Sequence, residues 1–235
     1  MSLTLKQLIE AWRGRDLLSR MLDEFRGMLA DAEWMFRTVG DVLDRRQKPE
    51  DVHDKFFALD QAINALEKDI RRRIVEHLSL RGDADVPACL VMMSVVKDAE
   101  RLGDYAKNIY EVAALWGGDP ASSDIGRDLE SLRGRVAAMF AQVSTAFASA
   151  DGDLAARLIA EAREIRDRCD DVVPRLFAAN LPSRDAVALA LLSRHYKRTA
   201  AHLANICTSV TGPVHELDYV AGVEERVRKT YGMNP

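Results

Sequence analysis

The strongest constraint on this chain is a set of long segments in which apolar residues recur every third or fourth position. Between residues 17 and 43 these positions form one stripe: Leu18, Met21, Leu22, Phe25, Met28, Leu29, Ala32, Met35, Phe36, Val39 and Leu43. This spacing lies on one face of an α-helix, and that face must pack on other helices. Only 13 Gly and 7 Pro are present, too few for the many tight turns of a β-sandwich or barrel. The sequence therefore predicts an all-α fold.

Turn-forming residues separate six such segments. Pro49 ends the first, Arg81-Gly82-Asp83 ends the second, and the strongest break is Gly117-Gly118-Asp119-Pro120. Asp85 is expected to cap the third helix, with Pro87 in its first turn. Helices are predicted at about residues 17–43, 50–77, 87–115, 125–148, 154–179 and 184–209.

The second group of three helices repeats the first. At a constant offset of 97, the residues Arg101, Asn108 and Ile109 match Arg198, Asn205 and Ile206. Helix count, order and turn positions agree as well, so we expect two tandem antiparallel three-helix bundles that arose by duplication. The expected units are residues 1–118 and 119–213, followed by a short tail or helix at 214–235.

Charge and cysteine content exclude several classes of protein. The 33 basic and 37 acidic residues give a net charge of −4, which leaves no electrostatic footprint for nucleic acid. The longest apolar stretch, Val86–Val96, is shorter than the roughly 20 residues that span a bilayer. No secretory signal is recognisable at the N-terminus, and the 3 cysteines form no CxxC pair. We therefore expect a cytoplasmic protein with no membrane span and with buried, reduced cysteines.

The segment from Glu100 to Asp104 carries the clearest functional information. Its two carboxylates are one helical turn apart on the same face, an arrangement that suits a hard cation. The second predicted helix supplies Asp60, Asn64 and Glu67 on one face, and an antiparallel neighbour would bring them to the same place. The alternative is an ordinary solvated face neutralised by Arg101 or Lys97, and on spacing alone this arrangement is the commoner one. Gly103, inside the predicted helix, indicates close approach of another group.

Enzyme motifs are missing from the sequence. A di-iron carboxylate oxidase needs paired Glu-x-x-His motifs on facing helices, and Glu50 with His53 is the single instance. Neither a Gly-rich phosphate loop nor a nucleophile elbow appears. We therefore expect a protein without enzymatic activity, the alternatives being such an oxidase or a metal-free helical interaction module.

The string ERLGDYAKNI, residues 100–109, resembles the third-helix signature of the PhoU family, and residues 59–67 resemble that family's second helix. The resemblance implies a tandem of three-helix bundles that regulates phosphate transport and signal transduction from the cytoplasm. It also implies an adaptor that contacts the ATPase of a phosphate ABC transporter and a membrane sensor histidine kinase. Members of the family bind multinuclear iron or zinc clusters through Glu/Asp-x-x-x-Asp motifs, which Glu100 and Asp104 occupy here.

The second half departs from this signature. Lys197 stands where the family has a glutamate and Ala201 where it has an aspartate, so a metal cluster is expected in the first repeat only. His195 and His202, seven residues apart, are either an altered second metal site or two histidines packed against the bundle. The long apolar helix faces favour a homodimer.

Overall fold

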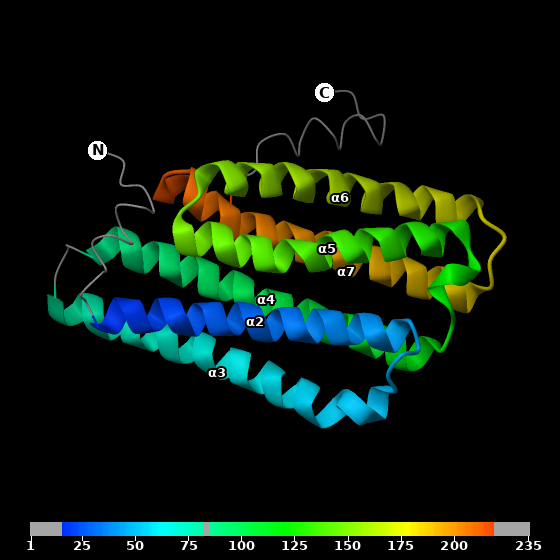
Figure 1. The fold of residues 1–235 in the computed structure, drawn as a ribbon, viewed down its shortest axis with the longest axis horizontal. Helices are drawn as coiled ribbons and strands as arrows, with labels where there is room; N and C mark the ends of the chain where they lie inside the picture. Colours follow the sequence, from blue (N-terminus) through cyan, green and yellow to red (C-terminus); the bar gives the residue numbers. More distant parts are fainter. Residues whose placement is uncertain (1–15, 82–84, 219–235) are drawn as a thin grey trace.

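The computed structural model describes residues 16–81 and 85–218. Within these ranges the chain forms long α-helices and two single 3-10 turns, without β-strands (Figure 1). The elements are α2 (Asp16–Leu43), α3 (Pro49–Arg81), α4 (Val86–Trp116), η2 (Pro120–Ser122), α5 (Asp124–Ser149), α6 (Gly152–Ala178), α7 (Ser183–Thr211) and η3 (Val214–Glu216).

The all-α prediction is confirmed, with each of the six helices close to its predicted bounds. The largest difference is in α3, which continues to Arg81. Asp85 precedes α4 as expected but makes no cap hydrogen bond, because its Oδ2 atom lies 2.8 Å from Nε2 of His77. Ser123 and Asp151 do cap α5 and α6, each accepting a backbone N–H of the following turn.

Helices α2–α4 and α5–α7 form two groups of three, joined by the segment around η2 (Figure 1). All six contribute to one continuous apolar core. Phe25 of α2 packs on Phe147 of α5 with ring centroids 4.8 Å apart, and Phe36 of α2 packs on Phe140 of α5 at 5.5 Å. The predicted arrangement of three-helix bundles is therefore present, and aromatic packing joins the two halves.

The third helix of each half, α4 and α7, lie antiparallel and side by side. Trp116 near the end of α4 donates from Nε1 to Asp185 near the start of α7, at 2.7 Å. Three turns further back along α4, the Tyr105 hydroxyl accepts from Nε of Arg198 at 3.0 Å. The matching helices therefore meet at the centre of the molecule, where a duplicated fold places equivalent residues opposite one another.

Two further expectations are confirmed in the interior. Gly103 is buried in α4, and a Cβ atom there would lie 3.2 Å from Cδ1 of Ile63 on α3, so the glycine permits close packing of these helices. The three cysteines are buried and free.

Among the described helices, none is both long and apolar enough to cross a membrane. Of the predicted tail, η3 belongs to the described residues, and 219–235 lie outside them.

Candidate metal centre

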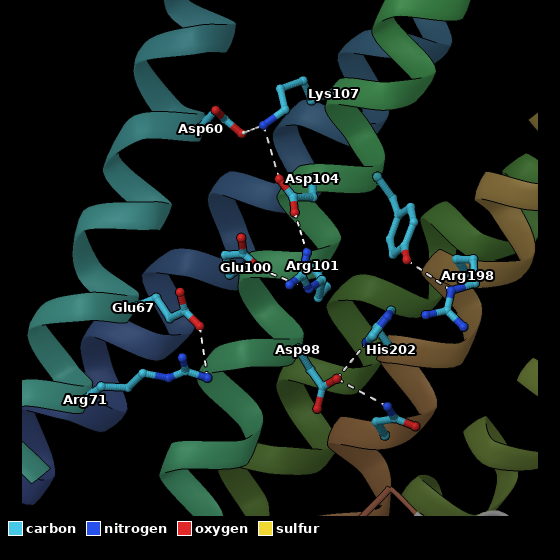
Figure 2. Close-up of polar contacts among 12 residues, drawn as sticks. Asp60, Glu67, Arg71, Asp98, Glu100, Arg101, Asp104, Lys107, Arg198 and His202 are labelled. Atoms are coloured by element: carbon cyan, nitrogen blue, oxygen red, sulfur yellow. Dashed lines mark hydrogen bonds and ion pairs between the residues drawn. The ribbon is translucent and has the colours of Figure 1, made fainter. Parts of the chain in front are cut away.

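Four carboxylates meet between α3 and α4, as the sequence predicted, and we refer to Asp60, Glu67, Glu100 and Asp104 as the acidic cluster (Figure 2). The side chain that joins the two helices is Lys107, one turn beyond Asp104. Its Nζ atom lies 2.9 Å from Oδ1 of Asp60 and 3.1 Å from Oδ1 of Asp104. Asn64, the remaining predicted ligand, is half-buried on α3.

Arginines neutralise the rest of the acidic cluster. Arg101 donates from NH1 to Oδ2 of Asp104 at 2.9 Å, and its Nε lies 3.5 Å from Oε2 of Glu100. Arg71 pairs with Glu67 along α3, with 3.1 Å between NH2 and Oε1. Every carboxylate of the cluster therefore has a cationic side chain within 4 Å.

The pKa values of Lys107 and Glu100 depend both on burial and on the neighbouring charges. Burial lowers the pKa of Lys107, but its hydrogen bonds to Asp60 and Asp104 outweigh that effect and raise the pKa overall. Burial also raises the pKa of Glu100 to about 7, and repulsion from Asp104 and Glu67 adds to the increase despite the nearby Arg101. Burial is thus the main reason why Glu100 holds a proton more readily than an ordinary carboxyl group.

The donor chemistry suits a hard cation, because carboxylate oxygens are the ligands such ions prefer. The geometry does not form a ready metal centre. Across residues 16–81 and 85–218, no group of three or more His, Cys, Asp or Glu side chains is arranged to hold a metal ion. Instead the Lys107 ammonium lies between Asp60 and Asp104. The described arrangement is a network of ion pairs, and the iron or zinc cluster stays a prediction.

The alternative interpretation named Arg101 or Lys97 as the neutralising side chain, and Arg101 is the one that pairs with the acidic cluster. Lys97 pairs elsewhere, with its Nζ 2.9 Å from Oδ2 of Asp218. Lys107 was missed. It lies within the ERLGDYAKNI string and three residues after Asp104, a spacing at which side chains on a helix meet, so the signal was available.

In the second half, Lys197 lies at the position corresponding to Glu100 and bonds Oδ1 of Asp170 on α6 at 2.5 Å. The Tyr105 ring of α4 lies against both His195 and His202, with ring centroids 6.0 and 5.5 Å away. Burial, and then the charge of Arg194, lower the pKa of His195. Each ring packs at the α4–α7 interface, and an altered second metal site at these histidines stays a prediction.

Asp98 is a further polar residue that the sequence reasoning did not identify. It is completely buried on α4, where its Oδ1 accepts from Nδ1 of His202 at 2.7 Å and from Nδ2 of Asn205 at 3.2 Å (Figure 2). The offset of 97 relates Asp98 to His195 and Tyr105 to His202. The pair Asp98–His202 and the pair His195–Tyr105 therefore occupy equivalent positions in the two halves. A hydrogen bond joins the first pair, and a ring contact joins the second.

The oxidase alternative gains no support from the structure. Glu50 and His53, the one Glu-x-x-His pair of the sequence, are exposed in the first turns of α3. The His53 ring packs on Phe57 at 4.7 Å and lies 3.2 Å from Asp54. Neither residue belongs to the acidic cluster.

Comparisons with known proteins agree with the resemblance found in the sequence. A family model described as "PhoU domain" matches residues 18–113 and again 129–210, once on each group of three helices. The phosphate-specific transport system accessory protein PhoU homolog of Xylella fastidiosa (strain Temecula1 / ATCC 700964) is 33% identical over 96 residues, which cover 40% of this chain and 39% of that protein.

Two crystal structures share the fold. PhoU from Pseudomonas aeruginosa superposes with a TM-score of 0.74 at 20% identity, covering 83% of this chain and 95% of that one. The phosphate transport system regulatory protein PhoU from Streptococcus pneumoniae gives a TM-score of 0.67 at 18% identity, covering 86% and 97%.

Proposed function

The chain belongs to the PhoU family, since the family model matches more than half of its length, and from that membership we propose that it is an accessory protein that regulates phosphate uptake. The observation that carries the proposal is the double match to the family model, one copy on each half of the molecule. The names of the similar proteins from Xylella and Streptococcus, which refer to phosphate transport, support the same role.

In this proposal the protein acts as a cytoplasmic adaptor without enzymatic activity. It contacts the ATPase of a phosphate ABC transporter and a membrane sensor histidine kinase, and so links uptake to phosphate-responsive signalling. Exposed apolar side chains at one end of the molecule supply a surface for such contacts or for a homodimer: Leu115 (77% exposed), Phe177 (89%) and Val187 (59%).

We further propose that the acidic cluster takes a divalent cation, iron or zinc, only in exchange for its own basic side chains. Glu100 and Asp104 with Asp60 and Glu67 would hold the ion, and Lys107 and Arg101 would have to leave. Two observations support this exchange. The cluster already binds the ammonium of Lys107 through Asp60 and Asp104, and the charges of Asp104 and Glu67 help to raise the pKa of the half-buried Glu100 despite Arg101. A bound metal would neutralise the cluster in their place.

Phosphate uptake tests the regulatory role. A strain that lacks the gene is compared with the same strain complemented by the wild-type gene, under phosphate limitation and phosphate excess. We expect deletion to change the uptake rate and the expression of a phosphate-responsive reporter, and complementation to restore both. Unchanged uptake and expression in both regimes would contradict the proposal. Co-purification of the tagged protein with the transporter ATPase or the sensor kinase tests the adaptor contacts.

A further inference from the structure

A groove of about 520 Å³ lies between α6 and the end of α7, and we refer to it as the α6–α7 groove. Its α6 residues share one helix face, because they are spaced by three or four positions: Ala156, Ile159, Ala160, Arg163, Glu164 and Asp167. The end of α7 contributes Thr208 and Thr211, and η3 contributes Glu216. The lining is therefore apolar toward the start of α6 and charged further along it.

Small side chains make room for the groove in the second half. In the second helices of the two halves, an offset of 99 aligns three pairs of buried residues: Phe56 with Ala155, Ile63 with Ala162, and Ile70 with Cys169. The same offset relates Phe57 to Ala156, Gln61 to Ala160, and Glu67 to Arg166. Ala156 and Ala160 are exposed. Two exposed alanines thus stand where α3 has larger side chains, and another segment can lie close to α6 there.

The chain itself leads to this groove. Glu216 lines it, and two residues later the backbone N–H of Asp218 donates to Oγ1 of Thr208, another lining residue, at 3.1 Å. The Asp218 carboxylate is also held by Lys97 of α4, with 2.9 Å between Oδ2 and Nζ. Residues 219–235 therefore begin beside the groove.

The sequence of residues 219–235 matches the groove in its apolar spacing. Every fourth position is apolar or aromatic, which is the spacing of one helix face: Tyr219, Val223, Val227 and Tyr231. A helix of this length would span about 25 Å at 1.5 Å per residue, and the α6 face from Ala156 to Asp167 spans about 17 Å. The segment is therefore long enough to cover the whole groove.

The charges of the segment and the groove are complementary. The segment has three basic residues, Arg226, Arg228 and Lys229, and two acidic ones, Glu224 and Glu225. The groove has three acidic residues, Glu164, Asp167 and Glu216, and one basic residue, Arg163. An excess of positive charge thus meets an excess of negative charge.

We propose that residues 219–235 of this chain bind in the α6–α7 groove. The end of α7 lies beside the start of α6, because these helices are antiparallel neighbours (Figure 1). The segment therefore enters at Ala156 and runs toward Asp167. Val223 and Val227 pack on the alanines of α6, and the basic residues lie toward Asp167. The inference goes beyond the proposed function, because it concerns contacts within the purified chain and does not depend on a role in phosphate uptake.

Limited trypsin digestion of the full-length protein tests the proposal, because Arg226, Arg228 and Lys229 are cleavage sites inside the segment. Mass spectrometry gives the cleavage rate at these sites. We expect Val223→Asp to raise this rate about tenfold or more above wild type, because a carboxylate would have to leave water for the segment to bind.

A second variant changes the groove and leaves the segment intact. Ala160→Glu should raise the cleavage rate by a similar factor, and combining it with Val223→Asp should add little, because binding is already lost. The matched control is Ala141→Glu, the same change at an exposed alanine of α5 that does not line the groove. Both alanines are exposed, so both variants are expected to fold.

Three results would overturn the proposal. They are equal cleavage rates in wild type and Val223→Asp, an equal rise in Ala160→Glu and Ala141→Glu, and protection of the wild-type segment that is lost on dilution. The last result would mean that the segment of a second copy of the chain occupies the groove.

Discussion

Replacing Asp98 by alanine should show how strongly the buried α4–α7 contact holds the two halves together. Asp98 has no exposed surface, and its carboxylate accepts hydrogen bonds from His202 and Asn205. The substitution leaves the buried Nδ1–H of His202 without an acceptor and opens a small cavity. Leaving a buried donor unsatisfied costs about 1–3 kcal/mol, and the cavity adds to this loss. Since a typical domain has about 5–15 kcal/mol of stability, the loss should be large.

Urea unfolding followed by circular dichroism at 222 nm measures the change. The matched control is Lys97→Ala, at the preceding position, where the ion pair to Asp218 is between side chains that are 37% and 33% exposed. An exposed pair of this kind contributes about 1 kcal/mol or less. In a double-mutant cycle, Asp98→Ala combined with His202→Ala should cost less than the sum of the single changes. A cost for Asp98→Ala equal to that of Lys97→Ala would refute the reasoning, as would strict additivity in the cycle.

Four further predictions concern stability. In chelator-treated protein, the folded pKa of Glu100, about 7 against the ordinary 4.5, means that the folded state binds more protons. The unfolding free energy should therefore fall as pH rises from 5 to 8, by up to about 3 kcal/mol, and Glu100→Gln should flatten this dependence. Gly126→Ala should lower the stability by about 2 kcal/mol or more in thermal unfolding, because its Cβ would lie 1.7 Å from the backbone oxygen of Pro120. Gly134→Ala, with open space around the new atom, should instead raise stability by about 0.5–1 kcal/mol. Trp116→Phe should cost about 1–2 kcal/mol through loss of its hydrogen bond to α7, with the same thermal unfolding as the measurement.

The helices could be predicted because their signal is local. The apolar stripe of residues 17–43 and the turn after Trp116 determine where helices begin and end, whatever they pack against. The repeat at an offset of 97 then predicts two equivalent groups of three helices. Gly103 was informative for the same reason, because an interior glycine in a helix implies a close neighbour, and that neighbour is Ile63.

The candidate site could be predicted only in part, because pairing depends on the register between helices. The sequence showed that Asp60 and Asp104 could meet if α3 and α4 were antiparallel neighbours. It did not show that Lys107 reaches both carboxylates, since this depends on how the two helices are aligned. Asp98 was missed because a single carboxylate beside Lys97 is typical of a solvated position. Its burial comes from α7, which is about 100 residues away in the chain.

The charge inversion between the halves was only half visible in the sequence. Lys197 in place of a glutamate follows from the helix motif alone. The corresponding change from Glu67 to Arg166 requires the buried positions of α3 and α6, which the structure supplies. Duplication thus gives one scaffold whose equivalent positions carry opposite charges in the two halves at Glu100 and Lys197 and at Glu67 and Arg166.

Metal binding by the wild-type protein and by Lys107→Met tests most directly the claim that the acidic cluster exchanges its own side chains for a divalent ion. Chelator-treated protein is titrated with zinc, or anaerobically with ferrous iron, and analysed for bound metal. We predict that Lys107→Met binds the ion about tenfold more tightly than wild type, and that Glu100→Ala with Asp104→Ala abolishes binding. Equal affinity in wild type and Lys107→Met would contradict the claim, as would stoichiometric metal that survives Glu100→Ala with Asp104→Ala.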